Sequence, residues 1–367
     1  MPTLYVDGDN GDDGNDGSTE LLAKATITAA ITAASSGDTI YIQNNGSTVY
    51  SERLSITDKS LQLVGYGSVT TDNTKAELDG TSAGAGIGIT VTMTTDAPWC
   101  QMFQNLYIHD YSSHGVYMVR SGGAGNPCAV LHNCKINDNG DRGFYINNYW
   151  TAKLIQCTVQ GNTGDGIQMT TGGTVILSRV LANGGFGVYG QTTSPTTVIE
   201  SEVAANAGNF RNCDVVHRCI SDATVGQDGM IVPSEATYTR ASMAIIVGAG
   251  ISNTPATYYG INNGGRIVLI SCGFYNNTTG NYTGTPTINN DPVTGSNPQY
   301  HAAGTYDFSL DGAAWKAQAI LIGCLDDAQT SSRDIGARQV TSSAGDITVI
   351  TMAPVVAATP GHAAPYM

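Results

Sequence analysis

Carboxylates at repeated positions are the side chains of this sequence best placed to do chemistry. Asp110 and Asp138 each stand two residues after an apolar residue of one repeating pattern, and Asp141 and Arg142 follow in the next turn. If successive repeats stack, two such carboxylates come close enough to share acid and base roles or to hold a cation. Asp110, Asp138, Asp141 and Arg142 are therefore the candidate catalytic residues. The alternative is structural, because acidic residues at turns commonly bond to turn backbone.

Two histidines lie close to the first of these carboxylates. His109 precedes Asp110 directly, and His114 follows it by four residues. A His/Asp pair activates a nucleophile when a Ser or Cys stands in register, and the sequence shows none there. The pair therefore does not predict a nucleophilic triad.

The N-terminal segment supplies a second group of oxygen ligands. Residues 4–16 are predicted to form a strand and an acidic, glycine-rich loop, and the candidate metal ligands in it are Asp7, Asp9, Asp12 and Asp16. The spacing departs from a calcium loop, since Gly11 and Ser18 stand where the third ligand and the closing glutamate belong. We expect no cofactor, with a structural calcium ion in this loop as the alternative.

Aromatic residues gather in the same part of the chain as the candidate catalytic residues. Tyrosine and tryptophan rings on a rigid sheet are good platforms for sugar rings or protein partners. The candidate binding surface consists of Tyr107, Tyr111, Tyr117, Tyr145, Tyr149 and Trp150. Spacing alone does not decide which of them face outward, since tyrosine also fills space between strands.

A sequence repeat positions these residues. An apolar residue, an asparagine three positions later and usually a glycine four beyond it recur in register. The asparagines Asn139, Asn162, Asn183 and Asn206 are 23, 21 and 23 residues apart (162−139, 183−162, 206−183), a period typical of stacked coils. Asparagine tolerates the left-handed backbone region, and its amide can bond to the next coil. The four are therefore predicted to form a ladder along one edge.

The residues before each asparagine alternate as in a strand with one buried face. Counting back in steps of two predicts three inward columns. They are Ile108, Ile136, Val159, Val180 and Val203; Leu106, Cys134, Cys157, Ser178 and Ser201; and Gln104, His132, Ile155, Ile176 and Ile199. One coil of about 22 residues cannot bury its apolar side alone, so coils must stack in parallel about 4.8 Å apart. The predicted fold class is all-β, a parallel β-helix.

Other segments flank the coils. Apolar residues at positions 23, 27, 30, 31 and 34 predict an amphipathic helix that covers the open end of the β-helix. The predicted organisation is a strand, acidic loop and capping helix in 1–45, coils in 46–290, closing coils in 291–340 and an apolar arm in 341–367. The arm is too apolar for a disordered tail, so we expect it to pack along the helix or into a partner subunit.

Both ends of the coil region resemble a known group of proteins. The opening "YVDGDNGDDGNDGS" with "ATITAAITAASSGDTIYI", and the run "DPVTGSNPQY…GTYDFSLDGAAW…DIGARQ", are similar to the first and closing segments of right-handed parallel β-helix proteins of the pectin-lyase-like superfamily. The resemblance implies a right-handed helix. It is specific for fold and weak for function, because the superfamily carries lyases, hydrolases, epimerases, virus tailspikes and proteins without chemistry. Its enzymes place carboxylates on outward strand faces, where Asp110 and Asp138 are the nearest candidates.

Composition and charge limit the classes of function. Sixteen basic against thirty acidic residues give a net charge of −14, so a nucleic acid partner is not expected. No apolar run is long enough to cross a bilayer, and the N-terminus lacks the regions of a signal peptide, so no membrane partner is expected. The eight cysteines are not a disulfide scaffold and match no zinc motif, and Cys134, Cys157 and Cys272 are expected to be small buried thiols. The expected location is a virion surface or the extracellular space.

Taken together, these features favour a non-enzymatic structural or attachment protein, specifically a surface component of a virus (phage) particle such as a decoration, tailspike or fibre protein that binds carbohydrate. The expected partners are other virion proteins or further copies of the chain through residues 341–367, and host-surface polysaccharide. Two alternatives stay open: a polysaccharide lyase or glycoside hydrolase acting on an acidic polysaccharide, and a bacterial surface carbohydrate-binding protein.

Overall fold

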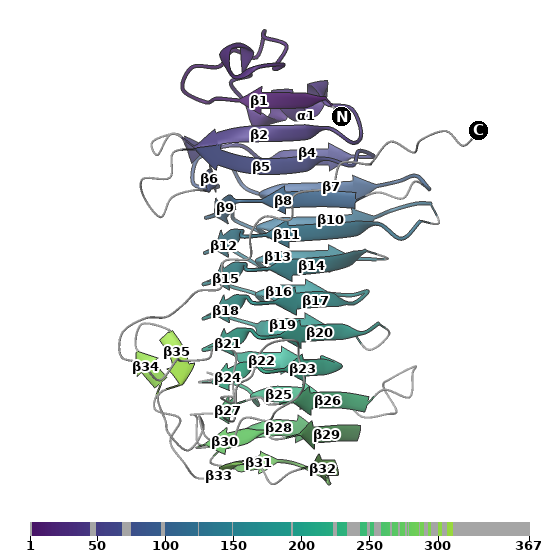
Figure 1. Cartoon of the computed structure of the whole chain (residues 1–367), viewed down its shortest axis with the longest axis vertical. Coiled ribbons are helices and arrows are strands. Elements are labelled where there is room, and N and C mark those ends of the chain that lie inside the picture. Colours follow the sequence, from purple (N-terminus) through teal and green to yellow (C-terminus); the bar gives the residue numbers. More distant parts are fainter. Residues whose placement is uncertain are drawn as a thin grey trace, which may run out of the picture.

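The chain winds into a stack of coils, each of which gives one strand to each of three parallel sheets (Figure 1). The computed structural model describes residues 2–44, 49–67, 75–96, 100–123, 125–148, 150–191, 194–222 and 226–232, and shorter pieces beyond: 243–247, 250–252, 258–264, 266–270, 272–275, 277, 279–285, 287–289, 293–294, 300–302 and 307–310. Most of the predicted closing coils, and the whole predicted arm at 341–367, lie outside the described residues. The predicted all-β parallel β-helix is confirmed.

The strands of each sheet are hydrogen-bonded in chain order, so neighbours in a sheet come from successive coils. Sheet A contains β1 (Thr3–Val6), β2 (Thr39–Asn44), β5 (Gln62–Gly67), β8 (Cys100–Gln104), β11 (Cys128–His132), β14 (Thr151–Ile155), β17 (Gly173–Ile176), β20 (Thr196–Ile199), β23 (Val215–His217), β26 (Met243–Val247), β29 (Arg266–Ile270) and β32 (Thr287–Asn289). Sheet B contains β3 (Val49–Tyr50), β6 (Ala76–Asp79), β9 (Leu106–His109), β12 (Lys135–Asn137), β15 (Thr158–Gln160), β18 (Arg179–Leu181), β21 (Glu202–Ala204), β24 (Ile220–Asp222), β27 (Gly250–Ser252), β30 (Gly273–Tyr275) and β33 (Val293–Thr294). Sheet C contains β4 (Leu54–Thr57), β7 (Ile89–Met93), β10 (Val116–Arg120), β13 (Phe144–Asn147), β16 (Ile167–Met169), β19 (Phe186–Gly190), β22 (Gly208–Arg211), β25 (Met230–Val232), β28 (Tyr259–Asn263) and β31 (Gly280–Tyr282). An antiparallel pair, β34 (Tyr300–Ala302) and β35 (Asp307–Leu310), follows the coils.

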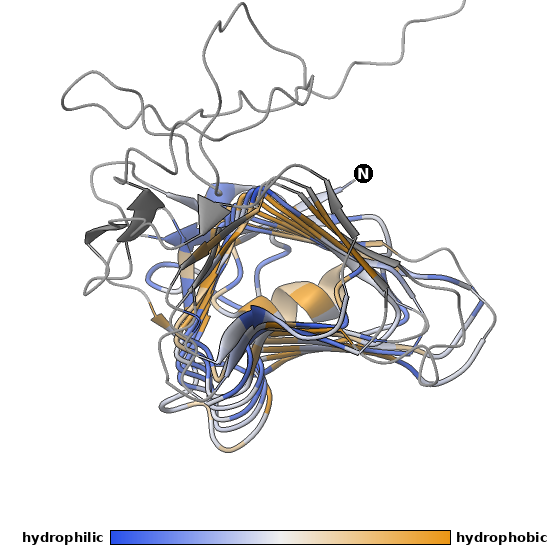
Figure 2. Cartoon of the chain, turned by 90° about the horizontal axis from the view of Figure 1, so that it is seen from below, coloured by the Kyte–Doolittle hydropathy of each residue, from blue (hydrophilic) through white to orange (hydrophobic). Residues whose placement is uncertain are grey.

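The core fills the interior of the coils, which the apolar faces of all three sheets surround (Figure 2). One coil illustrates the arrangement, since Leu131, Ile136 and Ile146 point inward from sheets A, B and C and each is fully buried. Because the sheets are parallel and in register, the same inward positions repeat from coil to coil. Apolar side chains therefore stack on one another along the axis, as the repeat predicts.

The corner between sheets A and B corrects one predicted column. Gln104, His132, Ile155, Ile176 and Ile199 are half-buried and not inward. The next residue in each coil has a left-handed backbone, for example Asn133 with φ 52° and Gln156 with φ 53°. This conformation turns the chain, so the period-2 alternation does not continue across it. The inward residue of sheet A is one position earlier, as at Leu131 and Leu154.

The predicted asparagine ladder is confirmed. Nδ2 of Asn139, Asn162 and Asn183 donates to Oδ1 of the asparagine in the next coil at 2.9, 2.9 and 2.8 Å, ending on Asn206. All four side chains are buried. The left-handed residue is not the asparagine, however, but the residue before it, Asp138 in the first of these coils. The asparagines are thus fixed by their buried amide bonds rather than by tolerance of an unusual backbone.

The predicted column of small residues runs along the corner between sheets A and B, at the opposite end of the sheet B strands from the ladder. Cys134, Cys157 and Cys272 are buried, which confirms their place inside the coils. Ser178 stands in the same column and accepts a hydrogen bond from the backbone amide of Cys157 at 3.1 Å. Small side chains with one hydrogen-bonding atom fit this tight corner, where the thiols contact backbone carbonyls.

The N-terminal helix covers one end of the interior, but it is shorter than the apolar pattern predicts. A 3-10 helix, η1 (Glu20–Leu22), precedes α1 (Ile27–Ala33), and between them Lys24 forms a bridge to Val6. Ile27 and Ile31 are buried against β1, β2 and β4 (Figures 1 and 2). Among the residues that the structure describes, no helix has the length and apolar character needed to cross a membrane.

Candidate functional site

The outer face of sheet B carries a group of ionisable side chains on three neighbouring strands. The register places Glu77, Tyr107 and Lys135 in one outward column. A second outward column contains Asp79, His109 and Asn137. The intervening residues Leu78, Ile108 and Ile136 are fully buried in the core. The apolar core therefore holds these six polar or aromatic side chains on one rigid surface.

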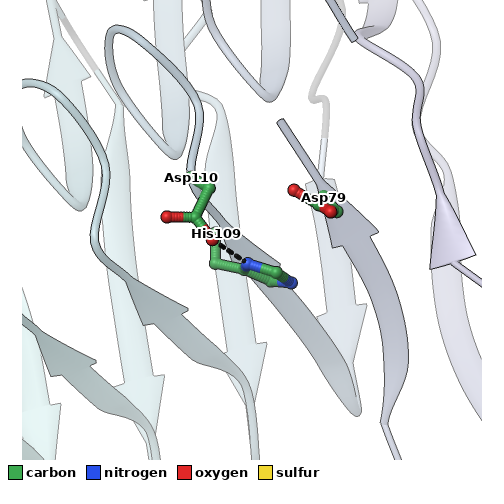
Figure 3. A group of neighbouring side chains, drawn as sticks. All are labelled: Asp79, His109 and Asp110. Carbon is green, nitrogen blue, oxygen red and sulfur yellow. Dashed lines mark hydrogen bonds and ion pairs between the residues drawn. The ribbon is translucent and has the colours of Figure 1, made fainter. Parts of the chain in front are cut away.

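His109 is the centre of this group (Figure 3). Its Nδ1 lies 2.7 Å from Oδ2 of Asp110, and its Nε2 lies 3.0 Å from Oε1 of Glu77. The ring stacks on Tyr107 at 4.1 Å between centroids, and the residue is only 7% exposed. Carboxylates accept and do not donate, so both contacts are hydrogen bonds when the imidazole carries two protons.

Negative charge surrounds the group. Burial raises the pKa of Tyr107, and the carboxylates of Asp138, Glu77, Asp110 and Asp79 raise it further. The nearest cation to this ring is Lys135, whose Nζ lies 4.3 Å from the ring centroid. The surface is thus a negative patch with a histidine at its centre and one lysine at its side.

Asp79 is held as a carboxylate at the edge of the group. Burial raises the pKa of Asp79, but hydrogen bonds from the hydroxyl and amide of Thr81, together with the charge of His109, outweigh burial and leave the pKa lowered. The Thr81 amide donates to Oδ1 at 2.7 Å. Asp79 therefore presents an ionised oxygen toward His109.

The four candidate catalytic residues separate into two groups. Asp110 and Asp138 have left-handed backbones and follow β9 and β12 on the side of sheet B. Asp141 and Arg142 lie beyond the buried ladder, on the side of sheet C, where Arg142 forms ion pairs with Asp141 at 3.4 Å and Asp165 at 3.6 Å. The predicted set is therefore not one centre, and the ladder separates its halves.

Three residues of the sheet B group, Glu77, Asp79 and Asn137, were not predicted from the sequence. Glu77 and Asp79 come from β6, in a coil without the marker asparagine. The sequence does contain a pattern for Glu77 and Asp79, because Ala76-Glu77-Leu78-Asp79 alternates between apolar and polar residues as Leu106-Tyr107-Ile108-His109 does. Without a ladder asparagine in the coil of β6, the sequence does not show that residues 76–79 pair with residues 106–109.

Three of the four candidate metal ligands at the N-terminus accept hydrogen bonds from turn amides. Asp7 Oδ1 accepts from the amides of Asp9 and Asn10, and Asp12 and Asp16 each accept from the amide two residues on. The ammonium of Lys24 enters the loop and donates to the carbonyls of Asp13 and Asn15 at 3.1 and 2.7 Å. Within the described residues, the one group of three His, Cys, Asp or Glu side chains with ligand atoms within 4.8 Å is Asp79, His109 and Asp110. The four predicted aspartates do not converge.

The predicted aromatic surface is correct only in part. Tyr111 is 1% exposed and Trp150 is fully buried, so both belong to the core. Tyr111 occupies the ladder position of its coil, where its amide donates to Oδ1 of Asn139 at 3.2 Å. Trp150 packs in the core cluster between sheets C and A. Tyr107 lies on sheet B as described, and Tyr149 lies outside the described residues.

The two remaining tyrosines of the predicted surface, Tyr117 and Tyr145, stand in an outward column of sheet C that also contains Tyr189. The register aligns Tyr117, Tyr145, Gln168, Tyr189 and Arg211 on β10, β13, β16, β19 and β22. Tyr117 and Tyr145 stack at 5.2 Å, Arg142 lies 4.7 Å from the Tyr145 ring, and Arg211 lies 4.8 Å from the Tyr189 ring. We call these five aligned residues the sheet C column.

His114, a half-buried histidine, lies against the sheet C column, with its ring centroid 5.5 Å from that of Tyr117 and 5.3 Å from that of Tyr145. Burial lowers the pKa of His114 below its usual 6.5. The negative charge of Asp141 raises this pKa, and the positive charge of Arg142 lowers it further. Near pH 6.5 and below it, the unfolded chain then binds more protons than the folded chain. Neutral His114 therefore favours the folded state above pH 6.5, and this part of the free energy of unfolding is lost on acidification. We expect the urea midpoint to fall between about pH 7.5 and about pH 5.5.

The same measurement on His114→Gln should give a smaller fall. Burial also lowers the pKa of His217, so His217→Gln should remove a separate share of the pH dependence. An unchanged pH dependence in both variants would contradict this assignment.

Comparisons with known proteins concern the fold. The family model "Right handed beta helix region" matches residues 85–216. The structure of pectate lyase Pel9A aligns with a TM-score of 0.54 at 13% identity, covering 92% of this chain and 96% of that one. The A-module of mannuronan C-5 epimerase AlgE4 from Azotobacter vinelandii (TM-score 0.39, 14% identity, 79% and 99% covered) and ORF18 of Geobacillus virus E2 (0.42, 14%, 82% and 62%) are more distant. A search of curated protein sequences found no match.

Proposed function

We propose that this chain, a right-handed parallel β-helix of the pectin-lyase-like superfamily, is an attachment protein that binds a polysaccharide along the sheet C column. The observation that carries the proposal is the stacked pair Tyr117 and Tyr145, with Tyr189 in the same column two strands further. Neighbouring strands are about 4.8 Å apart, so the half-buried rings of Tyr117 and Tyr145 lie one step apart along the axis and that of Tyr189 lies two steps further. Aromatic faces of this kind suit the apolar faces of sugar rings.

The charge around the column favours a neutral polysaccharide. Arg142 is ion-paired with Asp141 and Asp165, which neutralises the cation nearest the stacked pair. The chain as a whole carries a net charge of −14 and repels polyanions. A neutral or weakly charged saccharide is therefore the ligand class that we propose.

The location and partners of the protein are part of the same proposal. A stiff stack of coils suits display from a surface, and we propose that this surface is a virus particle, where residues 341–367 contact other virion proteins or further copies of the chain. Mass spectrometry of purified particles and the oligomeric state of the full chain with and without that segment test this part.

The binding proposal predicts that Tyr145→Ala weakens polysaccharide affinity at least about tenfold, because it removes the ring that both Tyr117 and Arg142 contact. Affinity electrophoresis of the full chain in gels with neutral or acidic polysaccharides measures this. Tyr41→Ala is the matched control, since Tyr41 belongs to an aromatic group on sheet A with Tyr5 and Tyr66.

Three results would contradict the binding proposal. They are equal retardation of the Tyr145→Ala variant, loss of binding in the Tyr41→Ala control, and no retardation of the wild-type chain by any saccharide. Ultraviolet absorbance from unsaturated products, appearing with an acidic polysaccharide, would instead favour the lyase alternative.

A further inference from the structure

The sheet B group has the composition of a metal site. Asp79, His109 and Asp110 bring ligand atoms within 4.8 Å of one another, and they come from two successive coils (Figure 3). Asp79 ends β6, His109 ends β9, and Asp110 follows in the left-handed turn. Each is anchored beside a fully buried residue of the core, so their spacing is fixed by the register of two paired strands.

A fourth side chain, Asn137, points independently to ligand binding at this group. Asn137 lies beside His109 in the register of β12 and β9, and Ile136 points inward, so Asn137 shares the outer face with His109. Asn137 is only 6% exposed, and within the described part of the chain its Oδ1 has no hydrogen-bond partner. Buried amide oxygens are normally satisfied, so this atom calls for a donor or a cation.

In the register Asn137 lies between His109 and Gln160, and the carboxylates grouped around His109 are acceptors rather than donors. Glu77, Asp79 and Asp110 present carboxylate oxygens, and both nitrogens of His109 already contact two of these carboxylates. One cation can take oxygens from Asp79, Asp110 and Asn137 together, whereas a protein donor would satisfy one of them. It also offsets the local negative charge, which one lysine at Tyr107 does not balance.

We propose that Asp79, His109, Asp110 and Asn137 bind a divalent transition-metal cation such as Zn²⁺. In this arrangement the cation replaces the proton between Nδ1 of His109 and Asp110, while Glu77 keeps its contact with Nε2 and orients the ring. An imidazole nitrogen in the ligand set favours Zn²⁺ and its neighbours over Ca²⁺, which prefers oxygen ligands alone. The site is on sheet B, so it does not depend on saccharide binding at the sheet C column.

Isothermal titration of the untagged full chain with Zn²⁺, after removal of metal by a chelator, tests the site. Cys100 and Cys128 are register neighbours on β8 and β11 and could bind zinc themselves, so all proteins carry Cys100→Ser and Cys128→Ser. We expect one Zn²⁺ per chain, at least about tenfold weaker binding in Asp79→Asn and in His109→Gln, and at least about tenfold weaker binding of Ca²⁺. Asn137→Ala should also weaken binding, and Asp141→Asn, on the far side of the ladder, should not.

Thermal unfolding separates a lost site from a lost fold. Zn²⁺ should raise the melting temperature of the parent chain and of Asp141→Asn, and should leave that of Asp79→Asn unchanged although its metal-free melting temperature stays close to that of the parent. Absence of Zn²⁺ binding to the parent, or equal affinity in Asp79→Asn and His109→Gln, would overturn the proposal.

Discussion

Replacing Asn162 with alanine is expected to destabilise the protein by about 3–5 kcal/mol, because one side chain closes hydrogen bonds in three coils. Its Oδ1 accepts from the backbone amide and Nδ2 of Asn139 at 3.1 and 2.9 Å. Its Nδ2 donates to Oδ1 of Asn183 at 2.9 Å and to the carbonyls of Ile136 and Gln160 at 3.2 Å. Alanine takes the acceptor from the amide and Nδ2 of Asn139, whereas Oδ1 of Asn183 and the carbonyl of Gln160 keep other donors. Each buried group left without a partner costs about 1–3 kcal/mol.

Urea denaturation followed by circular dichroism measures the loss, and hydrogen exchange shows where it falls. In a stack of coils each unit contacts only its neighbours, so the amides of β12, β15 and β18 should lose protection before those of distant coils. Gln160→Ala is the matched control, since it removes a half-buried amide of the same coil and should change stability by less than about 0.5 kcal/mol. Similar losses in both variants would mean that the ladder contributes no more than an ordinary polar residue.

The middle of the fold was predictable because one buried amide per coil marks the register. Asn139, Asn162 and Asn183 each need an acceptor in the next coil, so the sequence must repeat the residue at the same place. The apolar residue three positions earlier and the small residue five positions earlier are then fixed by the same stacking. Both of these columns are buried, as predicted.

Prediction failed in coils without the ladder asparagine and at corners where a left-handed residue interrupts the alternation of inward and outward side chains. Leu78 and Ile108 are register partners, but they are 30 residues apart (108−78), and Thr81 stands where later coils have asparagine. The contribution of β6 to the site was therefore not visible. At the sheet A corner, left-handed residues as different as Asn133 and Leu177 shift the alternation by one, and no single residue type signals this.

The candidate site was likewise predictable within one coil but not between coils. Asp110 and His109 were recognisable as neighbours in sequence, yet the carboxylates that complete their surroundings come from the preceding coil. Likewise Tyr111 and Tyr117 are both tyrosines in one coil, but the first fills a ladder position in the core and the second faces outward. Only the three-dimensional register distinguishes a tyrosine that packs from one that can bind.

Gly166→Ala is expected to cost about 2–4 kcal/mol although it adds a single methyl group. A Cβ at this position would lie 2.7 Å from Nδ2 of Asn183, 2.7 Å from Cγ1 of Val180 and 2.9 Å from the carbonyl of Gly187. The glycine of each repeat therefore leaves the space that the amide of the next ladder asparagine occupies. Gly226→Ala is the control, because a Cβ there meets nothing within 4 Å and its stability should be unchanged or slightly higher.

A double-mutant cycle tests this coupling between glycine and ladder. If the methyl group acts by displacing the amide of Asn183, then Gly166→Ala costs less in an Asn183→Ala background, where that amide is gone. We expect the double variant to be more stable than the sum of the single losses by about 1 kcal/mol or more. Additive losses, measured by urea denaturation of the four proteins, would mean that the glycine is required by backbone packing against Gly187 and not by the ladder.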